Sequence, residues 1–228
     1  MSQPCIGILM LETRFPRPPG DIGNPDTWPF PVRMRVVTGA SAEKVVLDDP
    51  RGLLGAFVDA GRALIAEGCT GLTTSCGFLS LMQDELKDAL SVPFASSPLM
   101  QLPMIEAMLP AGQQAGVLTI SLQSLSPAHL SAAGARADTA LAGMPRNGAF
   151  ASAIFNDCET MDFEACREEM ITAARGLVSQ NQNIGAIVLE CTNMAPYAAD
   201  IAQATGRPVH SVVSFLNWFQ AGLMPPRF

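Results

Sequence analysis

The stretch that decides the fold is Gly68-Cys69-Thr70-Gly71-Leu72-Thr73-Thr74-Ser75-Cys76-Gly77-Phe78, and a second stretch repeats its plan: Ile184-Gly185-Ala186-Ile187-Val188-Leu189-Glu190-Cys191-Thr192-Asn193-Met194. In each, a short apolar run typical of a buried parallel strand ends at a cysteine, and a helical pattern follows. In an open α/β sheet, ligands bind at this carboxyl edge of the strands. About half of the 228-residue chain separates Cys76 from Cys191. The spacing predicts two similar halves, each bringing one thiol to a shared cleft.

The composition excludes several classes of partner. Hydrophobic residues make up 48% of the chain and charged residues 15%, and the net charge is −7. Too few Lys and Arg are present to neutralise a phosphate backbone, so we expect no nucleic-acid partner and no binding to anionic membranes. A small anionic substrate needs only a few local donors and stays possible. The low share of charge favours an extensive subunit interface, so we expect a homo-oligomer, a dimer or larger.

The cysteines indicate a reducing compartment. No apolar run reaches the length of a membrane-spanning helix and the N-terminus lacks signal-peptide features, so we expect a cytoplasmic protein with reduced thiols. The six cysteines form no CxxC pair, and His129 and His210 have no metal-ligand spacing to any of them. We therefore expect no metal site. Cys69, Cys158 and Cys166 are interpreted as packing residues.

The order of predicted elements indicates an α/β fold with two pseudo-symmetric lobes, each a mostly parallel four-stranded sheet flanked by helices, and a site between the lobes. Apolar runs predict strands over residues 5–11, 32–37, 71–74, 92–95, 116–120, 139–144, 184–190 and 209–213. Helical spacing predicts helices over residues 50–67, 78–90, 99–109, 162–180, 196–205 and 215–222, whereas residues 145–157 are expected to be irregular.

A proline-rich segment follows the first strand. Residues 15–31 carry six prolines, which exclude a helix or a central strand. Loops of this length are usually lids, binding loops or disordered segments. Because this one leaves the carboxyl end of a strand and contains Trp28 and Phe30, we favour a lid or a subunit contact, with disorder as the alternative. Arg14 and Arg17 can clamp a distal carboxylate here, or stay solvated.

Two thiols facing one cleft suit proton transfer at a carbon acid. One thiolate removes a proton from a stereocentre while the other thiol returns a proton to the opposite face, which is racemisation without a cofactor. Charge developing on the substrate needs nearby donors, and the hydroxyl of Thr192 and the N–H groups of Gly77, Phe78 and Asn193 are placed to supply them. The alternative is that both cysteines are buried and inert.

Hydroxyl groups near the fifth strand offer a second set of donors. Thr119 and Ser121 lie at the strand end and can either hold a carboxylate or serve the local structure. Ser124 and Ser126 are better explained as helix caps.

The quoted motifs resemble the aspartate/glutamate racemase superfamily. The resemblance lies in Thr-Thr-Ser-Cys-Gly-Phe around Cys76, Leu-Glu-Cys-Thr-Asn-Met around Cys191, and Gly-Val-Leu-Thr over residues 116–119. That superfamily includes hydantoin and allantoin racemases, maleate isomerase and arylmalonate decarboxylase. The resemblance implies an N-terminal lobe of residues 1–98 plus 209–228 and a C-terminal lobe of residues 99–208. It also implies a cofactor-independent enzyme with an acid/base pair and a set of substrate-binding residues: catalytic Cys76 and Cys191, and substrate-binding Thr13, Ser75, Gly77, Phe78, Thr119, Ser121, Thr192 and Asn193.

The sequence departs from glutamate racemases beside both thiols. Those enzymes have Cys-Asn-Thr and Cys-Thr-His, where this chain has Cys76-Gly77-Phe78 and Cys191-Thr192-Asn193. The departures favour an amide, hydantoin-like or diacid substrate over glutamate. We therefore expect a two-cysteine racemase or epimerase of an amino acid or a derivative such as aspartate, glutamate or a hydantoin. The alternatives are a maleate-isomerase-like or arylmalonate-decarboxylase-like enzyme acting on a small carboxylate, and a non-catalytic small-acid-binding protein.

Overall fold

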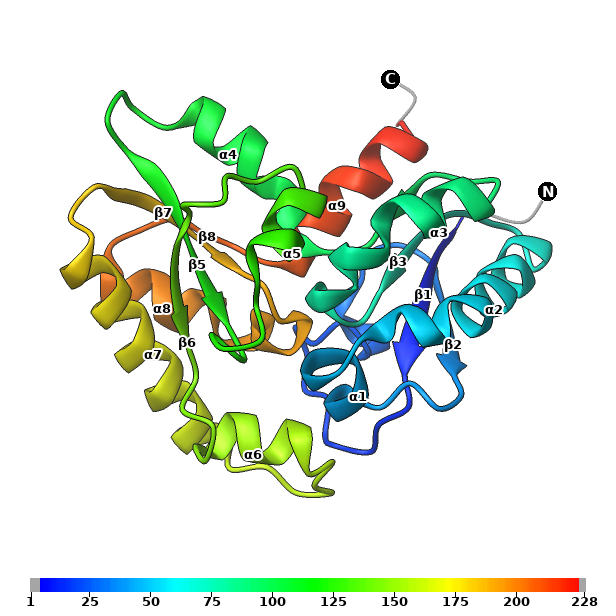
Figure 1. The fold of residues 1–228 in the computed structure, drawn as a ribbon, viewed down its shortest axis with the longest axis horizontal. Coiled ribbons are helices and arrows are strands. Elements are labelled where there is room, and N and C mark those ends of the chain that lie inside the picture. The colour runs from blue at the N-terminus through cyan, green and yellow to red at the C-terminus, as the bar shows by residue number, and fades with distance from the viewer. Residues whose placement is uncertain (1–4, 226–228) are drawn as a thin grey trace.

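Two parallel sheets form the framework of the protein. A computed structural model describes residues 5–225, and Figure 1 shows two lobes side by side, each built on one sheet. The first sheet has the order β2-β1-β3-β4, and the second has the matching order β6-β5-β7-β8. The strands are β1 (Cys5–Leu11), β2 (Val32–Val37), β3 (Cys69–Thr74), β4 (Phe94–Ala95), β5 (Gln114–Thr119), β6 (Ala140–Gly143), β7 (Ile184–Leu189) and β8 (Val209–His210). Every pair is parallel, which confirms the predicted fold class.

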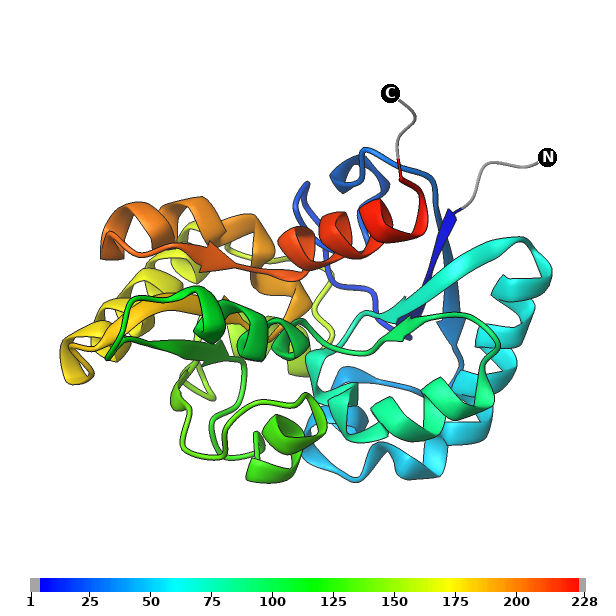
Figure 2. The ribbon, with the colours of Figure 1, turned by 90° about the horizontal axis from the view of Figure 1, so that it is seen from above.

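Helices cover both sheets. They are α1 (Ala42–Leu47), α2 (Leu54–Ala66), α3 (Gln83–Ala89), α4 (Leu102–Met108), α5 (Pro127–Ala132), α6 (Ala149–Phe155), α7 (Phe163–Gln180), α8 (Ala198–Thr205) and α9 (Val212–Leu223). All seven residues of β1 and all six of β7 are buried, as expected of parallel strands covered on both faces. In the view from above, α9 leaves the second lobe and runs back over the first (Figure 2). Its Val212, Phe215 and Leu216 pack with Ile6 and Ile8 of β1.

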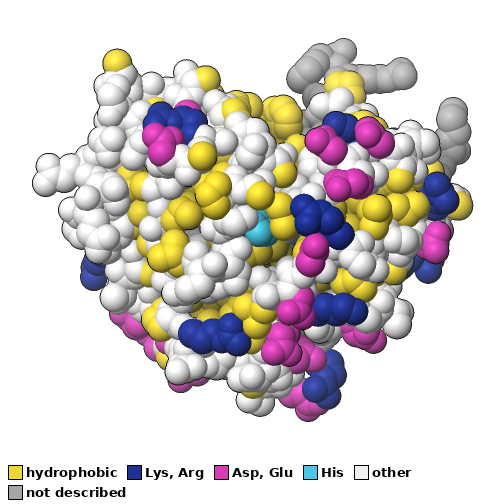
Figure 3. Space-filling model, in the orientation of Figure 1, with side chains coloured by type: hydrophobic (Ala, Val, Ile, Leu, Met, Phe, Trp, Pro, Cys, Tyr) yellow, Lys and Arg dark blue, Asp and Glu magenta, His cyan; other side chains and the backbone are white. Residues whose placement is uncertain are grey.

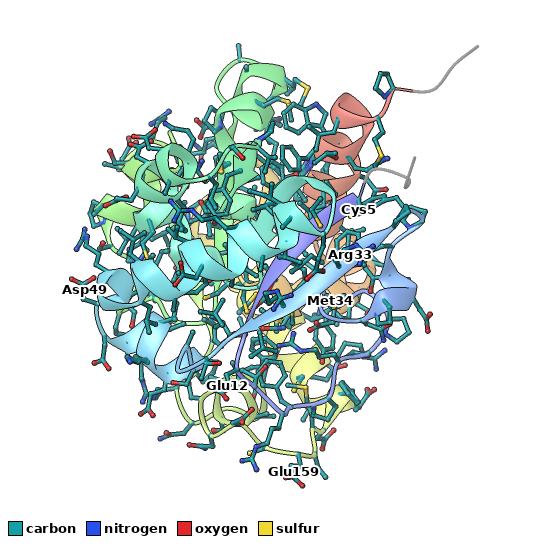
Figure 4. The ribbon with its side chains drawn as sticks, turned by 90° about the vertical axis from the view of Figure 1, so that its right-hand side faces the viewer. Cys5, Glu12, Arg33, Met34, Asp49 and Glu159 are labelled. Atoms are coloured by element: carbon teal, nitrogen blue, oxygen red, sulfur yellow. The ribbon has the colours of Figure 1, made fainter. Side chains whose placement is uncertain are left out.

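The direction of the strands puts their carboxyl ends between the lobes. In Figure 4, Cys5 lies at the start of β1 beside Arg33 and Met34 of β2, and Glu12 lies at the opposite end of β1. Cys5 and Cys69 are neighbours at the amino ends, with their Sγ atoms 3.2 Å apart. The thiols at the carboxyl ends therefore occupy a different edge of the sheet from this pair.

The proline-rich loop is packed between the lobes. Its Ile22 and Trp28 are buried, and the Trp28 Nε1–H donates to the Ile22 carbonyl at 3.1 Å. The short 3₁₀ helix η1 (Pro25–Thr27) is its one regular turn. Asp21 Oδ2 accepts a hydrogen bond from Asn193 Nδ2 at 2.7 Å, so the loop ties the first lobe to the second.

Several parts of the chain differ from the predicted elements. The predicted helices 78–90 and 99–109 each begin with a 3₁₀ helix, η3 (Gly77–Met82) and η4 (Pro98–Gln101), before α3 and α4. The stretch expected to be irregular contains α6, whose first N–H groups, of Ala149 and Phe150, donate to the Glu169 carboxylate of α7 at 2.6 and 3.1 Å. A cap supplied by a distant helix leaves no local signal, which is why periodicity missed it. The predicted helix 50–67 is divided into the 3₁₀ helix η2 (Pro50–Leu53) and α2, and it is preceded by α1.

The return of the chain to the first lobe falls slightly later than predicted. β8 pairs in parallel with β7, so residues 209 and 210 complete the second sheet and only the residues after them reach the first lobe.

Within residues 5–225, no helix is both long and apolar enough to cross a bilayer. On the face shown in Figure 3, basic side chains lie beside acidic ones, in keeping with ion pairs such as Arg51–Asp49 and Arg136–Asp138.

Candidate active site

The two cysteines of the repeated motif line one cavity between the lobes. Cys76 is the residue at which β3 gives way to the 3₁₀ helix η3 (Gly77–Met82), and Cys191 stands in the same place between β7 and η5 (Thr192–Tyr197). Both side chains are largely buried, with 7% of each residue exposed. The matching strand orders of the two sheets explain this meeting, because each sheet delivers its third strand in sequence to the same edge.

The room in this cavity for a water-sized sphere is about 20 Å³, and its walls are mostly apolar. Its apolar lining consists of Leu11, Phe15, Ala42, Val46, Ile120 and Ile154. Its polar lining, besides the two thiols, consists of Thr13, Arg17, Ser75, Glu190 and Asn193. Within residues 5–225, no group of three or more His, Cys, Asp or Glu side chains is arranged to hold a metal ion.

A chain of hydrogen bonds fixes the surroundings of Cys191. The Cys191 thiol donates to Asn193 Oδ1 at 3.6 Å, and Asn193 Nδ2 donates to Asp21 at 2.7 Å. Arg17 pairs with the other oxygen of Asp21 at 2.8 Å and donates to the Thr13 hydroxyl at 2.7 Å. Because the Asp21 carboxylate accepts from the amide N–H of Asn193, the amide oxygen of Asn193 is assigned to the side that faces the Cys191 sulfur. This oxygen favours the protonated thiol at Cys191.

Cys76 has a different environment. Burial and then the charge of Glu190 raise the pKa of both thiols above the usual range. At Cys76 the backbone N–H groups of Phe78 and Leu79 oppose that rise. At Cys191 the backbone N–H of Asn193 acts in the same direction, so backbone donors that stabilise a thiolate lie beside both cysteines.

Glu190 is a site residue that sequence reasoning missed. It is fully buried, its Oε2 accepts a hydrogen bond from Thr119 at 2.8 Å, and its Oε1 has no hydrogen-bond partner among the residues that the structure describes. Burial raises its pKa to about 7. A Cβ atom at position 77 would overlap the carbonyl oxygen and Oε1 of Glu190, so only glycine allows this close approach of the lobes. An acidic residue ending an otherwise apolar run was the available signal.

The predicted substrate-binding residues divide into two groups. Thr13, Ser75 and Asn193 line the cavity, as do the two cysteines. Five others are absent from its lining: Gly77, Phe78, Thr119, Ser121 and Thr192.

The second group serves the architecture around the site. The Thr119 hydroxyl donates to Glu190 Oε2. The Thr192 hydroxyl donates to the Ser75 carbonyl at 2.7 Å, and this hydrogen bond joins the lobes. The Phe78 ring packs edge-on against His129 with centroids 5.0 Å apart. Ser121 bonds to the Ser124 hydroxyl at 2.9 Å. These contacts use the hydroxyls of Thr119, Ser121 and Thr192 within the protein, whereas the backbone N–H of Phe78 lies beside the Cys76 thiol.

Of the two arginines considered as carboxylate clamps, one lines the cavity and the other lies outside it. Arg17 lines the cavity with its guanidinium 4.5 Å from the centre of the Phe15 ring. Arg14 is exposed and pairs with Asp157 at 3.1 Å and Glu159 at 3.2 Å, outside the cavity. Cys69 and Cys166 also lie outside the lining, and burial raises their pKa values to about 12 and about 11.

Comparison with known proteins finds sequence relatives that match nearly the whole chain. No protein-family model matches the chain. It is 28% identical to a dimethylsulfoniopropionate lyase of Durusdinium sp. clade D over 236 residues, covering 98% of this chain and 76% of the relative. It is 27% identical to dimethylsulfoniopropionate lyase 7 of Emiliania huxleyi (strain CCMP1516), covering 99% of this chain and 69% of the relative.

Solved structures share the two-lobed architecture. Unliganded arylmalonate decarboxylase aligns with a TM-score of 0.61 at 13% identity, covering 99% of this chain and 94% of that one. Allantoin racemase from Pseudomonas fluorescens aligns with a TM-score of 0.61 at 17% identity, covering 96% of this chain and 90% of that one. A glutamate racemase isoform from Bacillus anthracis aligns with a TM-score of 0.58 at 14% identity, covering 96% of this chain and 82% of that one. The expected resemblance is thereby confirmed in architecture, and the chain has the fold of the aspartate/glutamate racemase superfamily.

Proposed function

We propose that this protein is a cofactor-independent lyase that removes a proton from the carbon next to a carboxylate and expels a group from the neighbouring carbon. The first candidate substrate is dimethylsulfoniopropionate, the compound in the names of the relatives that match nearly the whole chain. The observation that carries the proposal is the pair of strand-end thiols, one from each lobe, lining one small and mostly apolar cavity.

The reaction needs one base. The Cys76 thiolate takes the proton from the α-carbon, so an S–H bond forms as the C–H bond breaks. The electron pair becomes the double bond between the α- and β-carbons, and the bond from the β-carbon to sulfur breaks with its pair going to sulfur. Neutral dimethyl sulfide and propenoate leave, and the thiol then releases the proton to solvent. A sulfonium leaving group needs no protonation, so an acid catalyst is not required at that end.

The carboxylate end of the substrate gains negative charge as the proton leaves. Arg17, Thr13 and Ser75 are the cation and hydroxyl donors that line the cavity, and they are the groups that can stabilise this charge. The Thr13 hydroxyl accepts its hydrogen bond from Arg17, which leaves its own proton free to donate to a ligand.

The apolar lining favours this substrate over a free amino acid. Two methyl groups on sulfur make no hydrogen bonds and can pack against Phe15, Ile120 and Ile154, whereas a primary ammonium group has three N–H donors to satisfy, more than the unpartnered Oε1 of Glu190 alone accepts. The second candidate function is racemisation or epimerisation of an amino acid or hydantoin. The observation favouring it is that thiols from both lobes reach the cavity, which elimination does not require.

The test is the release of dimethyl sulfide, measured by headspace gas chromatography, with propenoate followed by NMR. Wild type is compared with Cys76→Ser and with Cys158→Ser, a matched control because Cys158 is a half-buried thiol outside the cavity lining. We expect the control to keep its activity and Cys76→Ser to lose it. Deuterium entering aspartate, glutamate or a 5-substituted hydantoin without elimination of the sulfonium compound would instead establish the racemase. Binding without either reaction would indicate a non-catalytic acid-binding protein.

A further inference from the structure

Glu190 is an incomplete ionic site inside the cavity. Its side chain is fully buried and lies in the cavity lining with both thiols. Thr119 satisfies Oε2, but Oε1 has no partner in the part of the chain that the structure describes. A buried carboxylate with an unpaired oxygen is unfavourable unless a partner completes it. The partner that a carboxylate binds most strongly is a cation or a charged donor.

The cavity carries a second charge of opposite sign. Among residues 5–225, Arg17 is the only Lys or Arg in the lining, and it comes from the proline-rich loop, whereas Glu190 follows β7 in the other lobe. Asp21 and Thr13 hold the Arg17 guanidinium in place at 2.8 and 2.7 Å. A ligand that has a carboxylate at one end and a cation at the other matches this pair of charges.

We propose that Glu190 binds the positively charged end of the substrate, so that the site selects small zwitterions whose carboxylate lies toward Arg17. The inference rests on the proposed function in one respect, since the carbon that loses its proton lies between these two ends. It extends that function to a substrate class: short carboxylates that carry a sulfonium or quaternary ammonium group.

The position of Glu190 also couples binding to the reactivity of the thiols. Its negative charge raises the pKa of both Cys76 and Cys191. A cation bound against Glu190 offsets that charge and so favours the thiolate only when a zwitterion occupies the site. After elimination the sulfur compound leaves as a neutral molecule. The remaining anion then faces an unpaired carboxylate, which promotes its release.

Two ligands of the same shape test the proposal. One is 3-(trimethylammonio)propanoate, whose trimethylammonium group is a poor leaving group. The other is its carbon analogue, 4,4-dimethylpentanoate, in which an uncharged tert-butyl group replaces the trimethylammonium group. Isothermal titration calorimetry measures the dissociation constant of each with wild type, Glu190→Gln, Glu190→Asp and Glu85→Gln. Glu85 is an exposed carboxylate on α3 and serves as the control.

We expect wild type and Glu85→Gln to bind the ammonium ligand at least about tenfold more tightly than the neutral analogue, as a buried charge pair should. Glu190→Gln should bind the two about equally, and Glu190→Asp should keep part of the preference because it keeps the charge. Equal binding by wild type, or a preference that survives in Glu190→Gln, would overturn the proposal. Equal binding by wild type overturns the proposal even if Glu190→Gln fails to fold, and Glu190→Asp then shows whether the preference depends on this carboxylate.

The same proteins separate this inference from the proposed lyase activity. A charge preference that depends on Glu190 supports the zwitterion site even when no dimethyl sulfide is released. Release of dimethyl sulfide by a protein without that preference supports the lyase and overturns the role of Glu190.

Discussion

The two thiols occupy equivalent places in two similar lobes, yet their surroundings differ. Cys191 donates to Asn193, which is held by Asp21 and Arg17 of the opposite lobe. Within residues 5–225 the Cys76 thiol has no such acceptor, while backbone N–H groups lie beside both thiols, those of Phe78 and Leu79 at Cys76 and that of Asn193 at Cys191. The amide acceptor present at only one of the two strand-to-helix junctions supports our proposal that Cys76 is the base and Cys191 the protonated thiol. A repeated fold supplies matching positions, and the contacts between lobes make them unequal.

The largest expected effect is that of Cys76→Ser. A serine hydroxyl is far less acidic than a thiol, so the base is lost, and we expect kcat/KM for elimination to fall by about 10³-fold or more. Steady-state kinetics measure the fall, and circular dichroism shows that the fold is kept. Retention of most activity would remove Cys76 from the role of base.

Glu190 should make stability depend on pH. Burial raises its pKa from 4.5 to about 7, so the folded protein holds a proton that the unfolded chain has released. The free energy of unfolding should fall as the pH rises from about 4.5 to about 7, by on the order of 3 kcal/mol. Urea unfolding of wild type and Glu190→Gln across this window gives the difference. Parallel pH profiles for the two proteins would contradict the raised pKa of the buried Glu190 carboxyl.

Gly77 tests how closely the lobes approach beside Cys76. The Cβ of Gly77→Ala would overlap Glu190, and we expect a loss of about 1–3 kcal/mol in the free energy of unfolding. Gly176→Ala in α7 is the matched control, because nothing lies within 4 Å of its Cβ, and there alanine should stabilise the helix by about 0.5–1 kcal/mol. Equal effects of the two substitutions in chemical denaturation would show that the contact is loose.

The smallest effect should come from Cys191→Ser. Elimination needs a single base, and serine keeps a hydroxyl that can donate to Asn193, so we expect kcat/KM to fall only about tenfold, the effect of a perturbed neighbouring group. The kinetics are compared directly with those of Cys76→Ser. Equal and large losses in both variants would indicate that both thiols exchange protons with the substrate, as in a racemase.

The sequence predicts the parts of this site that depend on local patterns. Apolar runs ending in Cys76 and Cys191 are visible without a structure because buried parallel strands have a simple composition. Contacts between distant segments leave no such pattern, so the roles of Asp21 and Glu190 were missed. Thr119, predicted as a strand-end hydroxyl either to hold a carboxylate or to serve the local structure, donates its hydroxyl to Glu190 after the neighbouring strand, and a role in substrate binding stays a prediction.

Hydrogen exchange at a single carbon tests the inequality of the thiols most directly. The α-carbon of 3-(trimethylammonio)propanoate carries two hydrogens, one on each face, and a poor leaving group lets them exchange without elimination. The ligand is incubated with wild type in D₂O and followed by NMR. If Cys76 is the only base, one hydrogen is replaced, on one face, and Cys76→Ser stops the exchange. Replacement of both hydrogens, or none by a protein that binds the ligand, would contradict the account.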